Sequence, residues 1–234
     1  MTLIIDNTIT LNKRKYNMNT IKKLAILLLI PSTIFGAFQR KRKPITNHSS
    51  ASVLPYCIHN KRAYVLLGEE QRSQGMCWTD FGGKKDPKET ALQTAQRECY
   101  EESANVLGRG IINYKKAHGL FIGGHYFVIA PLRKKINLRV SDLPAIIENQ
   151  SKNLRRANKR HNIEKTHWKW IELKVFYKHL LSVKKRHNHR RKYYSSKDLT
   201  LQLKNSTMSL YRPLVRTCIR SKVLNTFDAI LKSV

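Results

Sequence analysis

Acidic side chains gather in one short stretch of a chain that is otherwise strongly basic. Of 234 residues, 45 are Lys or Arg and 15 are Asp or Glu, and six of those acids lie between residues 80 and 103. Glu98, Glu101 and Glu102 are spaced i, i+3 and i+4, which on a helix places all three carboxylates on one side. Because like charges on one turn repel each other, the pattern predicts a bound divalent cation that reverses this repulsion.

The cluster offers the ligands that Mg²⁺ prefers. This ion takes oxygen ligands, keeps several waters and is usually shared between one or two carboxylates and the phosphates of a substrate. Glu98 and Glu102, one helical turn apart, would aim at one ion, while Glu101 would hold a second ion or orient a water. Upstream, Gly82 and Gly83 carry no side chain, so their backbone can approach such a site closely.

The offsets between these residues resemble the sequence box of the Nudix hydrolase family. The matching positions are Gly83, Glu89, Arg97, Glu98, Glu101 and Glu102. One Gly, one Arg and four Glu at these offsets would arise by chance in on the order of one in a million chains of this composition. The last Gly of the box is Ala104 here and the apolar residue after it is Asn105. Ala for Gly is a mild change unless the backbone needs a positive φ at that position.

The resemblance implies a fold and a reaction. The fold is an α/β/α sandwich with a mixed sheet, and the match covers the box directly and is compatible with the strand pattern from about residue 53 to the end of the chain. The reaction is the metal-assisted hydrolysis of the pyrophosphate bond in a nucleoside diphosphate linked to another moiety, with Mg²⁺ or Mn²⁺ as the cofactor. The substrate itself is left open.

The resemblance also assigns roles to individual residues. The metal ligands would be three carboxylates and one backbone carbonyl, from Glu98, Glu101, Glu102 and Gly83. One of the carboxylates would double as the base that takes a proton from the attacking water. Arg97 would orient the acids, and Glu89 would be a supporting acid. Many members carry a further Glu before the last strand, so Glu164 would be an alternative catalytic base; otherwise it is an exposed acid at a strand end.

A helix is predicted to carry the box acids. Pro87 suits a helix start, because its missing N–H would have no partner there. Leu92, Ala95 and Cys99 recur at helical spacing and form one apolar stripe, so the helix is predicted to run from about residue 88 to 103. The carboxylates would then lie at the margin of the core.

Strands and further helices are predicted on both sides of this helix. Apolar runs closed by turn residues predict strands at 63–70 and at 76–81, the latter ended by two glycines, and two more on either side of Gly123 and Gly124. Downstream, the pattern predicts a helix within 141–160, a strand at 166–173, a helix at 174–183 and one amphipathic helix over 210–234. This order of elements is typical of an α/β fold with helices on the faces of a mixed sheet.

The start of the chain is predicted to be a targeting segment. Residues 24–38 are apolar or small and are followed at once by a basic run. A spanning helix needs roughly twenty apolar residues, so this run fits a signal peptide over 18–37 better than an uncleaved anchor or a buried helix. An exported or membrane-associated protein is expected, with a cytoplasmic one as the alternative. The predicted parts are a targeting segment at 1–39, a basic linker at 40–52 and a catalytic domain at 53–234.

The formal charge of +30 predicts salt-sensitive attraction to polyanions. The basic segments 152–165 and 184–197 would contact RNA, a phosphate-rich substrate or membrane lipid, or would be solvated loops, and residues 24–38 would supply any membrane contact. The rival to an enzyme is therefore a non-catalytic module whose fold holds a nucleotide or RNA against a basic surface.

Other residues with chemical potential are expected to be structural. The four cysteines match no metal-binding spacing, although a disulfide between Cys57 and Cys77 is left open. Trp168 and Trp170 would face one side of a strand and pack in the core, with base stacking as the alternative. His118 and His125 lie near strands that would border the site, where a lone His is more often structural than functional.

Overall fold

The computed structural model describes most of the chain after residue 47. The chain divides into two units, Met1–Pro44 and Ile45–Val234, and all of the described residues belong to the second. The expected targeting segment and most of the expected linker therefore lie outside the described residues. In the described ranges, no helix combines the length and the apolar character needed to cross a bilayer. These ranges are 48–133, 139–157, 164–187 and 194–234.

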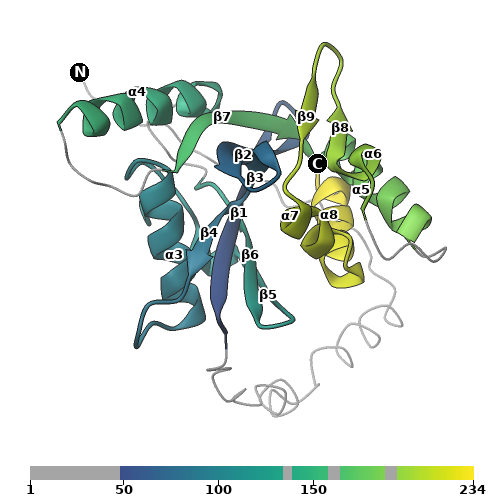
Figure 1. Ribbon diagram of the computed structural model, residues 1–234, viewed down its shortest axis with the longest axis horizontal. Helices are drawn as coiled ribbons and strands as arrows, with labels where there is room; N and C mark the ends of the chain where they lie inside the picture. The colour runs from purple at the N-terminus through teal and green to yellow at the C-terminus, as the bar shows by residue number, and fades with distance from the viewer. Residues whose placement is uncertain (1–47, 134–138, 158–163, 188–193) are drawn as a thin grey trace, which may run out of the picture. The chain divides into compact units, whose positions relative to one another are not determined.

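A seven-stranded mixed sheet forms the middle of the second unit (Figure 1). Its strands are β1 (Ser50–His59), β2 (Arg62–Arg72), β3 (Gly75–Thr79), β4 (Phe81–Lys84), β5 (His118–Ile122), β6 (His125–Pro131) and β7 (Lys165–Glu172). The main path runs β3-β2-β1-β6-β5, with β4 paired to β1 and β7 paired to β2. β1 and β6 are parallel, whereas the other pairs are antiparallel. The mixed sheet confirms the predicted α/β class.

The sheet begins earlier than the sequence predicts. β1 starts at Ser50 and so takes in the last three residues that were expected in the linker. It turns into β2 through Asn60 and Lys61, whose φ angles of 47° and 57° are those of a two-residue hairpin turn. Asn is one of the few residues that adopt this backbone readily.

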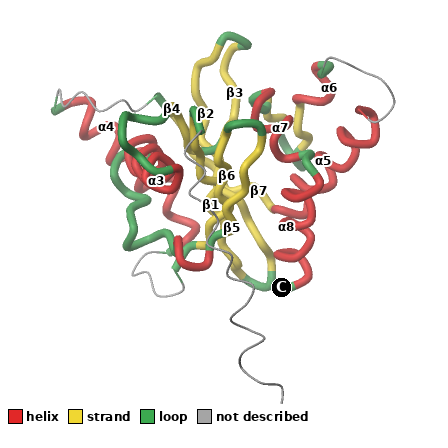
Figure 2. The backbone as a smooth tube through the Cα atoms, turned by 90° about the horizontal axis from the view of Figure 1, so that it is seen from below, coloured by secondary structure: helices red, strands yellow, loops and turns green. Residues whose placement is uncertain are grey.

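Helices cover both faces of the sheet (Figure 2). α3 (Ala91–Glu102) and α4 (Leu143–Arg156) lie on one face, and α5 (Leu173–His187), α7 (Arg212–Cys218) and α8 (Ser221–Lys232) on the other. Two separate cores result, because alternate residues of each strand point to opposite faces: Leu66 of β2 joins the α3 side, while Val65 and Leu67 join the α5 side. Short elements complete the unit, namely η1 (Tyr114–Lys116), η2 (Val140–Asp142), α6 (Ser196–Leu199), β8 (Thr200–Gln202) and β9 (Thr207–Ser209).

Helix α3 begins three residues later than predicted because a capping box fixes its start. The Thr90 hydroxyl accepts a hydrogen bond from Gln93 N at 3.3 Å, and Gln93 Oε1 accepts one from Thr90 N at 2.8 Å. Pro87 lies in the turn before the helix rather than at its first position. The predicted apolar stripe is wrong at Leu92, which is 37% exposed, and right at Cys99, which is fully buried.

The C-terminal part differs from the prediction in two ways. The single helix predicted over 210–234 is two helices, because Arg220 adopts an extended backbone and caps α8. The segment 184–197, predicted as a solvated loop, continues α5 as far as His187 and ends in the short helix α6, while 188–193 lie outside the described residues. The buried carboxylate of Asp198 in α6 accepts a hydrogen bond from Arg186 Nε at 2.7 Å, which ties this part together.

Buried cysteines and tryptophans have structural roles. All four cysteines are buried free thiols, so the Cys57–Cys77 disulfide left open by the sequence is not formed. Trp168 is 6% exposed and lies in the core on the α3 side. The Trp170 indole packs against the same core and donates a hydrogen bond to the Val140 carbonyl at 2.7 Å. Core packing therefore accounts for both tryptophans.

The turn after α3 uses a left-handed backbone at the position where the family has Gly. Ala104 has a φ of 53° and Asn105 a φ of 66°. A left-handed backbone costs a residue with a Cβ about 1–2 kcal/mol, and Asn tolerates it better than Ala. Ala104 is also fully buried, so its methyl group packs in the core in partial compensation.

We expect Ala104→Gly to leave the free energy of unfolding nearly unchanged, whereas Ala95→Gly in α3 should lower it by about 1.5 kcal/mol. Both alanines are fully buried, so replacing either one by Gly removes a buried methyl group and lowers the free energy of unfolding by about 0.8 kcal/mol. The greater backbone entropy that Gly loses on folding lowers it by a further 0.5–1 kcal/mol or so. At residue 104 alone, relief of the left-handed strain offsets these losses. Urea denaturation of both variants checks this, and equal losses would contradict the strained turn.

Candidate active site

The acidic face of α3 lies against β4, whose two glycines permit a close approach. Both glycines lie inside the strand, opposite Ala51 and Ser52 of β1, rather than in a turn that closes the preceding strand. A Cβ on Gly83 would lie only 2.5 Å from Glu98 Oε1. A Cβ on Gly82 would overlap the Ser52 side chain. Gly83 therefore forms a cradle in which the Glu98 carboxylate rests directly on the backbone.

Glu102 is the buried acid of the cluster. It is 3% exposed, its Oε2 accepts a hydrogen bond from Gly82 N at 2.7 Å, and the same oxygen lies 3.2 Å from Lys165 Nζ. Burial raises the pKa of Glu102 to about 8, against the opposing effects of the Lys165 ammonium and the Gly82 N–H. The Lys165 ammonium and the Gly82 N–H thus hold this carboxylate in the core against its cost of desolvation.

Arg97 holds the other acids of the box together. Its Nε and Nη2 donate to the two oxygens of Glu89 at 2.8 and 3.2 Å. Its Nη1 lies 2.9 Å from Glu98 Oε1 and 3.1 Å from Glu101 Oε2, and Nη2 also donates to the Lys84 carbonyl at 2.9 Å. One guanidinium thus bridges Glu98 and Glu101 and offsets the repulsion between carboxylates on this turn. Arg97, expected from the resemblance to orient the acids, thus contacts three of them.

The environments of Glu89 and Glu98 shift their pKa values in opposite directions. Hydrogen bonds from Arg97 lower the pKa of Glu89 to about 2, helped by the Asp86 N–H and the Thr94 hydroxyl. Burial raises the pKa of Glu98, although Arg97 opposes that shift. Glu89 is therefore a permanently charged support for Arg97, while Glu98 is poorly solvated and would gain from a cation.

A second charged group, which the sequence analysis missed, lies behind Glu102. Glu70 on β2 is fully buried, with Oε1 2.6 Å from Arg72 Nε and Oε2 3.2 Å from Lys165 Nζ. Lys165 on β7 is also fully buried and therefore bridges Glu70 and Glu102. Its stem passes over Gly68, where an added Cβ would overlap Lys165 Cδ. A glycine inside an apolar strand is the sequence signal of this close approach.

Glu164 lies at the edge of this second group. Its side chain is 58% exposed, and its Oε2 is 3.5 Å from Arg72 Nη2. Glu70, Glu102 and Glu164 each offer an oxygen within 4.8 Å of the other two, which makes them a convergent carboxylate trio in the described part of the chain. Glu98 and Glu101 converge on Arg97 instead. The structure thus brings Glu164 near Glu102, but as an exposed acid that already pairs with an arginine.

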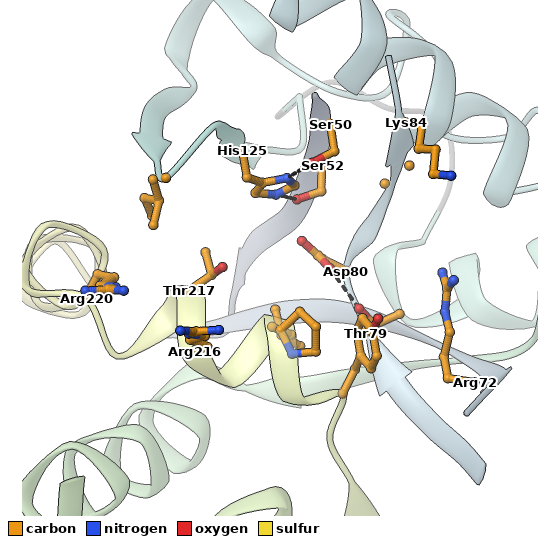
Figure 3. A pocket seen from close by; sticks show the side chains of 17 residues that line it. Ser50, Ser52, Arg72, Thr79, Asp80, Lys84, His125, Arg216, Thr217 and Arg220 are labelled. Atoms are coloured by element: carbon orange, nitrogen blue, oxygen red, sulfur yellow. Dashed lines mark hydrogen bonds between the residues drawn. The ribbon is translucent and has the colours of Figure 1, made fainter. Parts of the chain in front are cut away.

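A pocket of about 570 Å³ opens along the glycine strand (Figure 3). Its lining includes Gly82 and Gly83, the residues that contact Glu102 and Glu98 from the other side. The volume lies in the range of small-molecule sites. The charged residues that line the pocket are Arg72, Asp80, Lys84, Arg216 and Arg220.

His125 lies in the wall of this pocket between two serines (Figure 3). Its Nδ1 is 2.8 Å from Ser50 Oγ and its Nε2 is 2.8 Å from Ser52 Oγ. Burial lowers the pKa of His125, so the neutral ring donates to one hydroxyl and accepts from the other. The hydroxyl that accepts from the ring keeps its own hydrogen free to donate to a ligand. His118 is exposed on β5 and does not line the pocket.

The predicted ligands have the chemistry of a hard-cation site, but the carboxylates that converge in the described part of the chain are those of Glu70, Glu102 and Glu164. Every predicted ligand is an oxygen, from the carboxylates of Glu98, Glu101 and Glu102 and the Gly83 carbonyl, and Mg²⁺ and Mn²⁺ both accept such ligands. The missing Cβ at Gly83 is what lets a carboxylate and the backbone meet at one point. An ion held there would compete with Arg97 for Glu98 and Glu101.

Several cations in the described parts of the two basic segments have structural partners. Lys152 Nζ lies 2.8 Å from Glu148 Oε1, and Arg155 donates to the Lys165 carbonyl at 3.0 Å. Arg186 pairs with the buried Asp198 at 2.7 Å. Residues 158–163 and 188–193 lie outside the described residues. Binding of a polyanion by these segments stays a prediction.

Comparison with known proteins finds similarity to solved structures at low sequence identity. The sequence matches no family model and no curated protein. Among solved structures, the chain is similar to a C. elegans Ap4A hydrolase in a binary complex, with 18% identity over 79% of this chain and 99% of that one and a TM-score of 0.42. It is also similar to RenU, a Nudix hydrolase from M. smegmatis, with 14% identity over 81% of this chain and 89% of that one and a TM-score of 0.38. A T. brucei MERS1–RNA complex has 12% identity over 56% of this chain and 53% of that one, with a TM-score of 0.36. These values are too low to show a family, so function must be inferred from the residues of this chain.

Replacing Lys165 should destabilise the fold strongly. Lys165→Met keeps the apolar stem but leaves Glu70 and Glu102 buried without their shared cation, so the free energy of unfolding should fall by about 3–5 kcal/mol. Lys169→Met makes the same change at an exposed position of β7 and should cost no more than about 0.5 kcal/mol. Chemical denaturation of both variants measures the difference, and equal stabilities would show that the buried bridge is dispensable.

The contribution of Glu89 to stability should depend on pH. Its folded pKa of about 2 lies below its ordinary value of 4.5, so ionised Glu89 stabilises the folded state above pH 4.5, and this contribution is lost as the pH falls toward 2. Gln at this position carries no charge at any pH. The difference in unfolding free energy between the unmodified chain and Glu89→Gln should therefore shrink over this interval. Urea denaturation at several pH values checks it, and a constant difference would refute the ion pair with Arg97.

Proposed function

We propose that this chain is a divalent-metal-dependent hydrolase that cleaves the pyrophosphate bond of a nucleoside diphosphate linked to another moiety. The proposal depends on one observation: two acids at box positions, Glu98 and Glu102, contact the two glycines of β4, and the same glycines line a pocket. Glu98 rests on Gly83, and Glu102 accepts from Gly82 N. None of the box acids lines the pocket, so a phosphoanhydride bound there would have to extend past β4 to reach them.

The acids would have different roles, as metal ligands or as the base, because their side chains differ in exposure. Glu98, Glu101, Glu102 and the Gly83 carbonyl would hold Mg²⁺ or Mn²⁺. When bound, such an ion neutralises charge on the pyrophosphate and lowers the pKa of a coordinated water. The proton of that water would go to a carboxylate. Among these acids Glu101 is the most exposed, with 34% of its side chain accessible, so it is our choice for the base.

Glu102 and Glu164 suit the role of base less well. Glu102 Oε2 is already shared between Gly82 N and Lys165 Nζ, so this oxygen is committed to holding the carboxylate in place. Glu164 offers an oxygen within 4.8 Å of one from Glu102, but its carboxylate is exposed and pairs with Arg72. We propose Glu102 as a ligand and Glu164 as the alternative base.

The alternative is a non-catalytic module that binds a nucleotide or RNA. The cost of burying charge argues against this alternative. Glu102, Glu70 and Lys165 are all less than 5% exposed. Removing such ions from water is unfavourable even when they are paired. A site that only binds would be more stable with apolar residues there. A site that must hold a cation and move a proton needs them.

Glu101→Gln and Glu98→Gln should each lower turnover about 10²–10⁴-fold, because they remove the base and a metal ligand without changing side-chain size. The assay uses the full chain, Mg²⁺ or Mn²⁺, and a panel of nucleotides, with release of phosphate products as the readout. Glu148→Gln makes the same change at an acid on α4, outside the box, and should leave turnover unaffected. A chelator should abolish the activity. If the unmodified chain binds nucleotides but turns none of them over, the module is the better description.

A further inference from the structure

The wall of the pocket opposite the glycine strand presents two guanidinium groups. Arg216 on α7 and Arg220 at the junction between α7 and α8 both line the pocket, on the side away from Lys84 (Figure 3). Both side chains are exposed, and neither lies within ion-pair distance of any carboxylate in the described ranges. Two guanidinium groups that face a pocket without an anionic partner suit phosphate, which Arg binds through two parallel hydrogen bonds.

Other cations of the pocket are already engaged or lie elsewhere. Arg72 pairs with Glu70 and Glu164 and lies over the Tyr211 ring, with Cζ 5.4 Å from the ring centroid. Lys84 is the last residue of the glycine strand and lines the pocket there. The pocket thus has a positive charge at each end, from Lys84 of β4 at one end and from Arg216 and Arg220 at the other.

Polar groups occupy the space between these ends. The serine hydroxyl that accepts from the neutral His125 ring offers a hydrogen to a ligand oxygen. Asp80 is the one acid among the lining residues, and its Oδ1 accepts from Thr79 Oγ1 at 2.8 Å. Its carboxylate would repel a phosphate but accept from a sugar hydroxyl or a base N–H. The middle of the pocket therefore favours a nucleotide over a bare oligophosphate.

We propose that Arg216 and Arg220 bind the part of the substrate's phosphate chain that lies beyond the cleaved bond, and that they determine specificity. The preferred substrates would then be nucleotides with three or more phosphates in a chain, rather than nucleoside diphosphates joined to an uncharged group such as a sugar. A diphosphate held at β4 would leave the second positive end of the pocket without an anion. This inference rests on the proposed function, which places the cleaved bond at Gly83.

Calorimetry on the full chain with Mg²⁺ tests the specificity. The probes are analogues of a nucleoside triphosphate and of a nucleoside diphosphate in which an imido group replaces every oxygen that bridges two phosphorus atoms, so that no phosphoanhydride bond is left to cleave, together with inorganic tripolyphosphate. The triphosphate analogue should bind about 10-fold more tightly than the diphosphate analogue, as expected for added hydrogen bonds between charged groups. Arg216→Gln and Arg220→Gln should each remove about 10-fold from triphosphate binding and leave diphosphate binding within about twofold. Tripolyphosphate should bind more weakly than the nucleotide.

Arg212→Gln is the matched control. Arg212 is an exposed cation on the same helix and does not line the pocket, so this variant loses the same charge without loss of the contact. Circular dichroism confirms that each variant is folded. Equal affinity of the unmodified chain for both analogues, or an effect of Arg212→Gln as large as that of Arg216→Gln, would overturn the inference.

Failure of this inference can be told apart from failure of the proposed function. Turnover of nucleotides that is indifferent to Arg216 and Arg220 would refute the specificity and leave the hydrolase in place. Arginine-dependent preference for the triphosphate analogue without turnover of any nucleotide would refute the hydrolase and leave the binding site in place.

Discussion

The candidate site depends on the absence of side chains at two adjacent positions of one short strand. Gly82 and Gly83 let β4 lie against β1 on one edge and against the acids of α3 on its face, and a Cβ at either position would overlap a neighbour. The backbone at Gly82 supplies an N–H to Glu102, and the bare Cα of Gly83 receives Glu98. The same two residues also line the pocket, so one short strand borders both the acids and the pocket.

Buried charges fix the site from behind. Glu70, Glu102, Lys165 and Arg72 form a chain of ion pairs that crosses β2, β7 and α3 and balances two acids against two bases. At low dielectric such a chain is costly to assemble and costlier to break, because removal of one member leaves an unpaired charge. It therefore contributes less to net stability than to orientation. Glu102 is held in one position because alternative positions would leave its carboxylate buried without Lys165 and Gly82 N as partners.

Local sequence patterns predicted the local parts of this arrangement and not the distant ones. The i, i+3, i+4 spacing was enough to place Glu98, Glu101 and Glu102 on one side of a helix, and the apolar runs were enough for most strands. The pairing of Glu70 with Lys165 joins residues far apart in sequence, so no periodicity could reveal it. Similarly, the break at Arg220 interrupts a continuous apolar pattern, and it is this break that gives the pocket its second arginine.

Arg97 explains how a cluster of like charges can exist on one helical turn. Unaided, the carboxylates of Glu98 and Glu101 would repel each other and adopt separate rotamers. The guanidinium of Arg97, anchored by a Glu89 whose pKa is about 2, holds both of them at about 3 Å from one nitrogen. An arriving cation would then meet oriented ligands and need only share them with Arg97. Preorganisation of this kind lowers the entropy that binding must overcome, which is the physical reason for an arginine directly before the acids.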